Sequence, residues 1–335
     1  MARARFSRMQ QKAADNVVLM EKLSSKEFFL EDGADPKPVL GEIDLSIQKG
    51  QVWGINGKSL FEIKLLLEIM ANIKPYRDGK CVLVEQGMMR LKRIILPHIF
   101  YVGSPGMVYN NMNVLEFLMF ATAKSRVDKV EQQEQIFESL INIGLKNISL
   151  TPLNMLSKEQ KAVIILIVGA YSGSQLIVFN FPDYDFDDVL LGAMAKTARF
   201  ITSKEKTLVV GTKDSSLIEK ACSHTAFLLD GRIFFQGTVK EFRLTYDKIM
   251  ITIWDQKISE MAEALAAVLP QYQYDIRDKS LVVSNFGPEE SNPKLVYEKV
   301  VEAGFAPEKV RINPKKVQNA CEEIIKQYDL QKQLL

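Results

Sequence analysis

Cysteine and histidine are scarce in this chain of 335 residues, which holds three and two of them respectively. Cys81, Cys222 and Cys321 are widely separated and odd in number, and neither His98 nor His224 has a neighbour at metal-ligand spacing. Disulfide frameworks and structural zinc sites both need paired or clustered ligands. The sequence therefore predicts a reducing compartment and no structural metal.

Long apolar runs and an excess of charge of one sign are also missing. The longest apolar run, residues 162–171, is well short of the roughly 20 residues that span a bilayer. Lys and Arg number 43 against 41 Asp and Glu, and the formal net charge of +2 is too small to indicate nucleic acid. We therefore expect a cytoplasmic protein with no membrane span and no nucleic-acid partner.

The N-terminal 15 residues are basic, with Arg3, Arg5 and Arg8, but polar residues follow where a secretion signal has its apolar region. We expect residues 1–15 to be a solvated tail. Contact of this tail with a membrane surface is the alternative.

The rest of the composition, 47% hydrophobic and 25% charged, is that of a globular protein with room for two domains. Between residues 16 and 243, continuously apolar strands alternate with helical patterns, which indicates a parallel sheet covered on both faces. Strands at 17–20 and 43–47 suit an antiparallel subdomain, and two amphipathic helices at 113–124 and 128–143 suit a helical insert.

The second helix of this insert is predicted to bury one face and to end at Gly144. Its inward residues are expected to be Val130, Phe137, Leu140 and Ile141. After a hairpin that turns at Asp230 and Gly231, residues 244–335 follow a β-α-β-β-α-β order with one added helix. The sequence thus predicts three parts: a tail over residues 1–15, a first domain over 16–243 and a smaller α+β, ferredoxin-like domain over 244–335.

Four short motifs stand where predicted strands end or predicted helices begin. They are Gly54-Ile-Asn-Gly-Lys-Ser59, Leu156-Ser-Lys-Glu-Gln160, Asn180-Phe-Pro182 and Gly211-Thr-Lys-Asp214. In this order they resemble the landmarks of an ABC transporter nucleotide-binding domain, and the C-terminal part resembles the accessory domain of ABC-2 exporter-type ATPases. The resemblance implies an α/β, P-loop NTPase-like fold of the ABC type, with ATP and Mg²⁺ as the family's ligands.

The first motif departs from the family's phosphate loop, G-x-N-G-x-G-K-S/T. Gly54, Asn56 and Gly57 match its start, but Lys58 and Ser59 arrive two residues early. Such a loop encloses a phosphate with successive backbone N–H groups, and a shortened loop cannot do so in the usual way. Two interpretations stay open: a weakened phosphate site, and a plain strand-to-helix turn whose glycines supply positive φ angles, which the sequence favours.

The second motif departs from the family's LSGGQ signature, because Lys158 and Glu159 replace its two glycines. Both add bulk where the family's backbone approaches the γ-phosphate, and Glu159 adds a repelling charge. Ser157 and Gln160 have the spacing of a capping box for the helix that follows. The sequence favours this capping role over contact with a phosphate.

The third motif lacks the carboxylates with which the family binds Mg²⁺ and activates water. Asn180 has a carbonyl oxygen that a metal could accept, whereas Phe181 has no lone pair for a water molecule. Asp187 matches the family's D-loop aspartate. The acidic residues around it, from Asp183 to Asp188, are expected to form a solvated loop and a helix N-terminus.

Lys213 stands where the family has its switch histidine, and a surface lysine in a turn is the favoured interpretation. The family's metal-linked glutamine would fall near residues 103–105, where there is none. Phe28 or Phe29 is a candidate for the adenine-stacking aromatic residue, although a core position is expected.

The sequence therefore predicts a catalytically degenerate ABC-type subunit, a pseudo-ATPase with no catalytic residue and no metal site, which binds Mg-ATP only weakly if at all. Its expected partners are an ABC-2-like membrane permease, an active ABC ATPase subunit, or both, and a permease would hold it at the inner face of the cell membrane. Two alternatives stay open. One is a weak ATPase driving export that uses Lys58, Ser59, Asn180 and Lys213 in unusual roles, and the other is a soluble regulatory scaffold.

Overall fold

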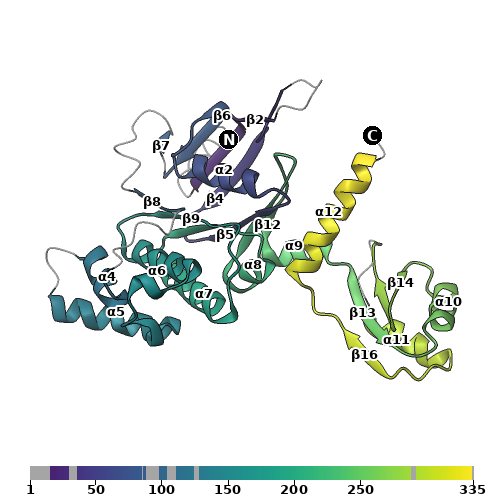
Figure 1. Cartoon of the computed structure of the whole chain (residues 1–335). Coiled ribbons are helices and arrows are strands. Elements are labelled where there is room, and N and C mark those ends of the chain that lie inside the picture. The colour runs from purple at the N-terminus through teal and green to yellow at the C-terminus, as the bar shows by residue number, and fades with distance from the viewer. Residues whose placement is uncertain are drawn as a thin grey trace, which may run out of the picture. The chain divides into compact units, whose positions relative to one another are not determined.

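A computed structural model gives the fold of the chain (Figure 1). The described residues are 16–29, 36–84, 86–87, 98–103, 111–123, 128–287 and 292–333. The chain divides into two compact units between Val239 and Lys240. This division falls at the start of α9 (Val239–Tyr246), and the sequence-based boundary after residue 243 falls in the same helix. The predicted basic tail, residues 1–15, lies outside the described residues.

The first unit is built on a six-stranded sheet with the order β12-β11-β5-β10-β9-β8. Its strands are β5 (Val52–Gly57), β8 (Ile99–Val102), β9 (Leu176–Asn180), β10 (Thr207–Gly211), β11 (His224–Leu229) and β12 (Arg232–Thr238). All neighbours are parallel except β11 and β12. These two form the predicted hairpin, since Asp230 and Gly231 at its turn have φ angles of 45° and 75°.

Helices cover both faces of this sheet, as the apolar strands predict (Figure 1). They are α2 (Leu60–Met70), α4 (Val114–Ala121), α5 (Lys129–Ile143), α6 (Lys158–Tyr171), α7 (Asp188–Ser203) and α8 (Ser215–Ala221). Alternate residues of the central strand β9 enter different cores. In β9, Ile177 and Phe179 join the core of α4 to α8, whereas Leu176 and Val178 join the core that contains α2.

A second, antiparallel sheet with the order β4-β1-β6-β7 packs into the α2 core. Its strands are β1 (Asn16–Ser25), β4 (Ile43–Gln48), β6 (Tyr76–Leu83) and β7 (Gln86–Gly87), and β2 (Phe28–Phe29) pairs with β3 (Lys37–Pro38) beside it. The sequence predicts β1 and β4 but not β6. The first half of β6 is exposed and includes Gly79 at φ +90°, so it lacks the alternation of a half-buried strand.

The buried face of α5 differs in part from the prediction. Leu140 is buried as expected, but Val130 and Ile141 are 65% and 44% exposed, so the expected face is wrong at these positions. The buried residues are Ile136, Leu140 and Ile143, a narrow stripe with i, i+4, i+7 spacing. The C-cap is confirmed, since Gly144 has the left-handed φ of 89°.

The second unit is a ferredoxin-like domain with an added C-terminal helix, as predicted. Its elements are β13 (Ile249–Trp254), α10 (Ile258–Val268), β14 (Gln273–Arg277), β15 (Ser280–Ser284), α11 (Pro293–Glu302), β16 (Lys309–Ile312) and α12 (Val317–Gln333). The sheet is antiparallel with the order β14-β15-β13-β16 and has a core of its own with α10 and α11. Across the described parts of both units, none of the helices has the length and apolarity needed to cross a bilayer.

Candidate functional site

The fold brings the four motifs to one edge of the parallel sheet. Strands β5, β10 and β9 are parallel neighbours in register, with Gly211 opposite both Ile55 and Asn180, so the segments that follow them leave from the same edge. Helix α6 ends just before β9 begins, which puts its first turn at this edge as well. There the Lys158 ammonium lies 4.6 Å from the centre of the Tyr184 ring, in the segment after β9.

The connection between β5 and α2 is only two residues long. The strand continues through Gly57, and the helix begins at Leu60. The Ser59 hydroxyl accepts a hydrogen bond from the Glu62 N–H at 3.3 Å and so caps the helix. The Gly57 N–H donates to Asn56 Oδ1 at 2.7 Å, and the Lys58 N–H donates to the Leu228 carbonyl at 3.3 Å. Backbone donors of this stretch are thus bonded to the chain itself.

The glycines of this motif are explained by close packing rather than by positive φ angles. The expectation of positive φ is wrong for Gly54 and Gly57, which lie inside β5 and are not among the residues with positive φ. A Cβ on Gly57 would lie 2.4 Å from the Leu228 carbonyl oxygen, and one on Gly54 would lie 2.9 Å from Ile218 Cγ1. The motif therefore lets β5 lie close to β11 and α8.

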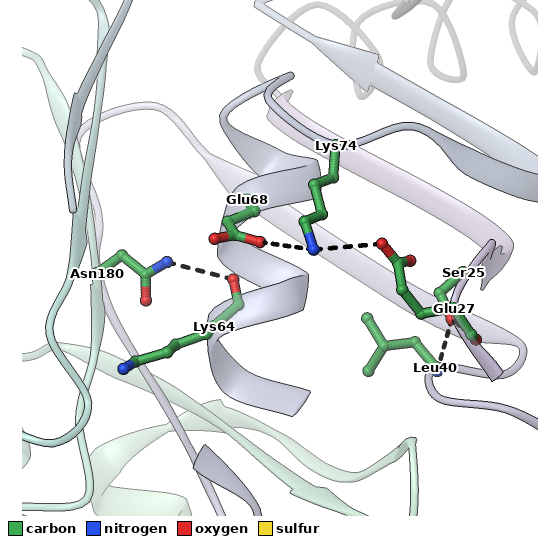
Figure 2. A network of polar contacts seen from close by, with 7 residues as sticks. All are labelled: Ser25, Glu27, Leu40, Lys64, Glu68, Lys74 and Asn180. Atoms are coloured by element: carbon green, nitrogen blue, oxygen red, sulfur yellow. Dashed lines mark hydrogen bonds and ion pairs between the residues drawn. The ribbon is translucent and has the colours of Figure 1, made fainter. Parts of the chain in front are cut away.

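Asn180, at the end of β9, is turned into the protein toward α2 (Figure 2). Its amide nitrogen donates to the Lys64 carbonyl at 3.2 Å and to the Tyr101 hydroxyl at 3.0 Å. Its Oδ1 is buried and has no hydrogen-bond partner in the described part of the chain.

The groups around Asn180 are not a set of ligands that fits Mg²⁺. Magnesium prefers carboxylate and phosphate oxygens, and no carboxylate bonds to this amide. The described residues contain no group of three His, Cys, Asp or Glu side chains that could hold a metal. Asp183, the first acidic residue after β9, is paired with Lys64 at 3.1 Å. Burial opposes ionisation of Asp183, but the Lys64 hydrogen bond and charge outweigh it and hold its pKa below the usual value.

Phe181 is folded into an aromatic cluster. It is 2% exposed, and its ring centre lies 4.8 Å from that of Phe179 and 4.7 Å from that of Tyr184. Phe186 completes the cluster, with its ring centre 6.1 Å from that of Phe179 and 6.2 Å from that of Tyr184. Because side chains alternate along the chain at this strand end, Asn180 faces α2 and Phe181 faces the opposite core.

The remaining acidic residues of this segment form a helix N-terminus, as predicted. Asp187 caps α7 by accepting from the Leu190 N–H at 2.8 Å. Asp188 is exposed and paired with Lys220 at 2.5 Å. Lys220, through its hydrogen bond and its charge, lowers the pKa of the Asp188 carboxyl.

The predicted capping box of α6 is confirmed. The Gln160 N–H donates to Ser157 Oγ at 3.1 Å, and the Ser157 N–H donates to Gln160 Oε1 at 2.9 Å. Lys213 is exposed in the turn between β10 and α8, also as expected. The expected glutamine position falls partly on residues 104 and 105, outside the described residues.

Phe28 and Phe29 are half exposed, at 36% and 43%, so the expected core position is wrong for both. The Arg77 guanidinium lies 5.0 Å from the centre of the Phe28 ring, where it offers a cation–π contact. Next to them, Lys74 bridges Glu27 and Glu68 at 3.3 and 3.5 Å and thereby ties the end of α2 to the β1–β2 connection (Figure 2).

Sequence reasoning missed Glu62, which is 4% exposed in the first turn of α2. Burial raises the pKa of its carboxyl; a hydrogen bond from the Gly231 backbone opposes this shift, and the charge of Asp230 adds to it. One oxygen, Oε2, has no hydrogen-bond partner among the described residues. The sequence does hold one indication of this burial, because Glu62 lies between apolar residues in the helical pattern that predicts α2.

Curated sequence relatives are ATP-binding proteins of ABC transporters, while no protein-family model matches the chain. A putative ABC transporter ATP-binding protein of Listeria monocytogenes is 21% identical over 257 residues, which are 72% of this chain and 92% of that protein. One from Pyrococcus furiosus is 26% identical over 64% of this chain and 82% of its own length. A methionine import ATP-binding protein of Lactiplantibacillus plantarum is 21% identical over 67% of this chain and 64% of its own length.

Solved structures give the same result for the fold. An ATP-binding subunit of an ABC transporter superposes with a TM-score of 0.54 at 15% identity, over 68% of this chain and 92% of that one. The cbiO1 protein of Clostridium perfringens, part of the ABC transporter complex cbiONQ, gives a TM-score of 0.56 at 17% identity, over 76% of this chain and 96% of that one. The chain therefore has the α/β fold of ABC ATPases and is similar in sequence to ABC transporter ATP-binding subunits.

Proposed function

We propose that this chain is a pseudo-ATPase subunit of an ABC transporter, one that keeps the shape of an ATP-binding subunit without its hydrolytic chemistry. The observation that carries the proposal is the buried Phe181, which stands in an aromatic cluster at the strand end where an ATPase presents its catalytic carboxylate. A phenyl ring has no lone pair with which to position or deprotonate a water molecule.

Binding of the triphosphate is proposed to be weak or missing for a separate reason. The two-residue connection after β5 leaves no glycine loop to enclose phosphate oxygens, and the Ser59 hydroxyl caps α2. Asn180, which donates to Lys64 and Tyr101, replaces the metal-binding carboxylate with a neutral amide. Losses of roughly 10²–10⁴-fold for each missing acid–base role would reduce turnover to background.

A transporter partner is proposed because apolar side chains are exposed at the edge of the parallel sheet where the four motifs lie, here called the motif edge. Phe61 in the first turn of α2, Met155 just before α6 and Val189 in the first turn of α7 are 47%, 75% and 63% exposed. All three begin or precede helices at the same edge of the parallel sheet, and apolar side chains gathered on one surface are typical of protein interfaces. We propose that this edge contacts an active ABC ATPase subunit and that an ABC-2-like permease is the membrane component of the complex.

Titration with Mg-ATP tests the proposal. We expect no saturable shift in melting temperature up to millimolar Mg-ATP and no phosphate release above a protein-free blank. An ABC ATPase with intact motifs, assayed in parallel, provides the positive control. A micromolar Kd together with measurable phosphate release would favour the weak ATPase instead.

Restoring the two carboxylates gives a sharper test of the site. The double substitution Asn180→Asp with Phe181→Glu is expected to leave ATP hydrolysis at background, because the β5–α2 connection stays short. It should also lower stability by more than about 3 kcal/mol, since Phe181→Glu places a charge in an aromatic core. Strong recovery of hydrolysis would contradict the proposed role of the short connection.

Fractionation of cells that express the tagged full chain separates a transporter subunit from a scaffold. We expect the chain to sediment with membranes and to purify with a polytopic protein after mild detergent extraction. A chain that stays in the supernatant under the same conditions would favour the soluble regulatory scaffold.

A further inference from the structure

A cavity of about 330 Å³ lies in the first unit between α5, α6 and α7, away from the motif edge. Tyr171 is the last residue of α6, which precedes β9. Phe200 lies near the end of α7, which precedes β10. The cavity is therefore at the amino edge of the parallel sheet, opposite the segments that follow β5, β9 and β10. It is independent of the candidate nucleotide site.

The cavity has an apolar body formed by three helices. Ile143 from α5, Ile167 and Tyr171 from α6 and Phe200 from α7 line it. The Tyr171 and Phe200 rings are 5.3 Å apart at their centres and tilted by 51°, so they present two aromatic surfaces. Its volume is within the range of small-molecule pockets, and an apolar lining with few polar groups is typical of them.

Positive charge is concentrated around these rings. Lys204 lies over both, with its ammonium 4.7 Å from the centre of the Tyr171 ring and 4.0 Å from that of the Phe200 ring. Lys206 donates to the Ala170 carbonyl at 2.8 Å and to the Ser172 carbonyl, and so caps the C-terminus of α6. These two cations have structural partners.

Two further cations that line the cavity have no ion-pair partner among the described residues. Lys196 and Arg199, both exposed on α7, form no ion pair with any carboxylate in the described part of the chain. Arg199 Nε donates to the Ala195 carbonyl at 3.3 Å, and the Lys196 ammonium lies near Gly144, the C-cap of α5. A helix C-terminus supplies only about half a negative charge. An anion would therefore complete this site.

We propose that this cavity binds a small amphiphilic organic anion, with an aromatic or short alkyl body against Tyr171 and Phe200 and an anionic group against Lys196 and Arg199. Ser139 also lines the cavity, and its hydroxyl is hydrogen-bonded to the Tyr171 hydroxyl at 2.5 Å. Because Arg199 has a planar fork of donors, a carboxylate or sulfonate suits it better than a spherical ion.

The test uses the full-length chain and two fluorescent probes of nearly the same shape, anionic 1-anilinonaphthalene-8-sulfonate and neutral N-phenyl-1-naphthylamine. In the double variant Lys196→Gln/Arg199→Gln, we expect affinity for the anionic probe to fall at least about tenfold, while affinity for the neutral probe changes less than about twofold. In Phe200→Ala, affinity for both probes should fall, because the shared apolar contact is lost.

A matched double variant, Lys26→Gln/Lys129→Gln, removes the same net charge from exposed positions of the first unit. It should bind both probes as the unmodified chain does, and far-UV circular dichroism and melting curves check that all variants fold. The proposal is overturned if the unmodified chain does not bind the anionic probe at about 1 mM, or if the cavity variant and the matched variant weaken it equally. Unchanged binding in Lys196→Gln/Arg199→Gln would overturn it as well.

Discussion

At the scale of single residues, Asn180 and Phe181 are neighbours at one strand end whose side chains face opposite sides of the sheet. Asn180 faces α2, and its amide donates hydrogen bonds to the Lys64 carbonyl and the Tyr101 hydroxyl. Phe181 faces the other core and contributes apolar area there. A carboxylate at either position would therefore place a charge among groups that suit a neutral side chain.

Glu62 gives a residue-scale prediction on pH. Burial raises its pKa in the folded state above the ordinary value of 4.5, so the fold favours the protonated form. Its stabilising contribution is complete below about pH 4.5 and is lost as pH rises through the raised value. At pH 7 we therefore expect Glu62→Gln to increase the free energy of unfolding.

Denaturant unfolding at several pH values checks this prediction. The advantage of Glu62→Gln should shrink as pH falls from 7 to 4, because the carboxyl of the unmodified chain becomes neutral as well. Glu134→Gln on exposed α5 is the control and should show no such trend. A variant that is less stable than the unmodified chain at pH 7 would show that the charge of Glu62 is compensated by its surroundings.

At the scale of elements, the β5–α2 segment is organised by packing. Gly57 lets β5 approach β11, and Gly211 lets α2 lie on β10, where a Cβ would be 2.2 Å from Leu67 Cδ1. Ser59 begins α2 with a side-chain cap. Close packing and this cap therefore hold the strand, the turn and the helix together.

Gly57→Ala should destabilise the first unit by more than about 2 kcal/mol, because the added Cβ would meet the Leu228 carbonyl oxygen at 2.4 Å and backbone must shift. Gly192→Ala in the middle of α7 is the matched substitution. Nothing lies within 4 Å of its added Cβ, so it should raise stability by up to about 1 kcal/mol through helix propensity. Thermal melts of the two variants beside the unmodified chain measure both effects, and equal shifts would refute the packing argument.

Ser157→Ala tests the start of α6. Loss of its side-chain cap should cost about 1 kcal/mol, and adding Gln160→Ala should cost less than the sum of the two single changes, because the residues form one reciprocal box. A double-mutant cycle by urea unfolding measures this coupling. Strict additivity would show that the two hydrogen bonds act independently.

At the scale of the whole molecule, each of the two units has a core of its own. The ferredoxin-like unit buries residues of β13, β15, α10 and α11 against one another. Buried Asp247 accepts from the Lys316 N–H at 2.7 Å and from Asn319 Nδ2 at 3.1 Å, which ties the start of α12 to the strand β13. These contacts lie within one unit.

We therefore expect a fragment of residues 240–335 to fold alone. It should show a cooperative melt and well-dispersed amide resonances, since its core and its polar anchor are complete. Asp247→Ala in this fragment should lower the melting temperature, because three backbone and side-chain donors lose their acceptor. A fragment without a cooperative transition would show that the units depend on each other for stability.

Local pattern in the sequence determined most of the elements and several of their ends. The apolar strands β9 and β10, the capping box of α6, the hairpin turn at Asp230 and the ferredoxin-like order follow from side-chain period and turn chemistry, which act over a few residues. The alternation Leu176 to Phe181 could also have placed Asn180 and Phe181 on opposite faces.

Only the tertiary structure decided which neighbours each residue meets. The glycines of β5 are packing residues because Leu228 and Ile218 are close. Glu62 is buried beside the turn of the β11–β12 hairpin, and Lys196 and Arg199 of α7 line an aromatic cavity because α5 and α6 complete it. Such contacts join segments far apart in the chain. Burial and charge pairing at these positions therefore cannot be predicted from the spacing of residues in the sequence.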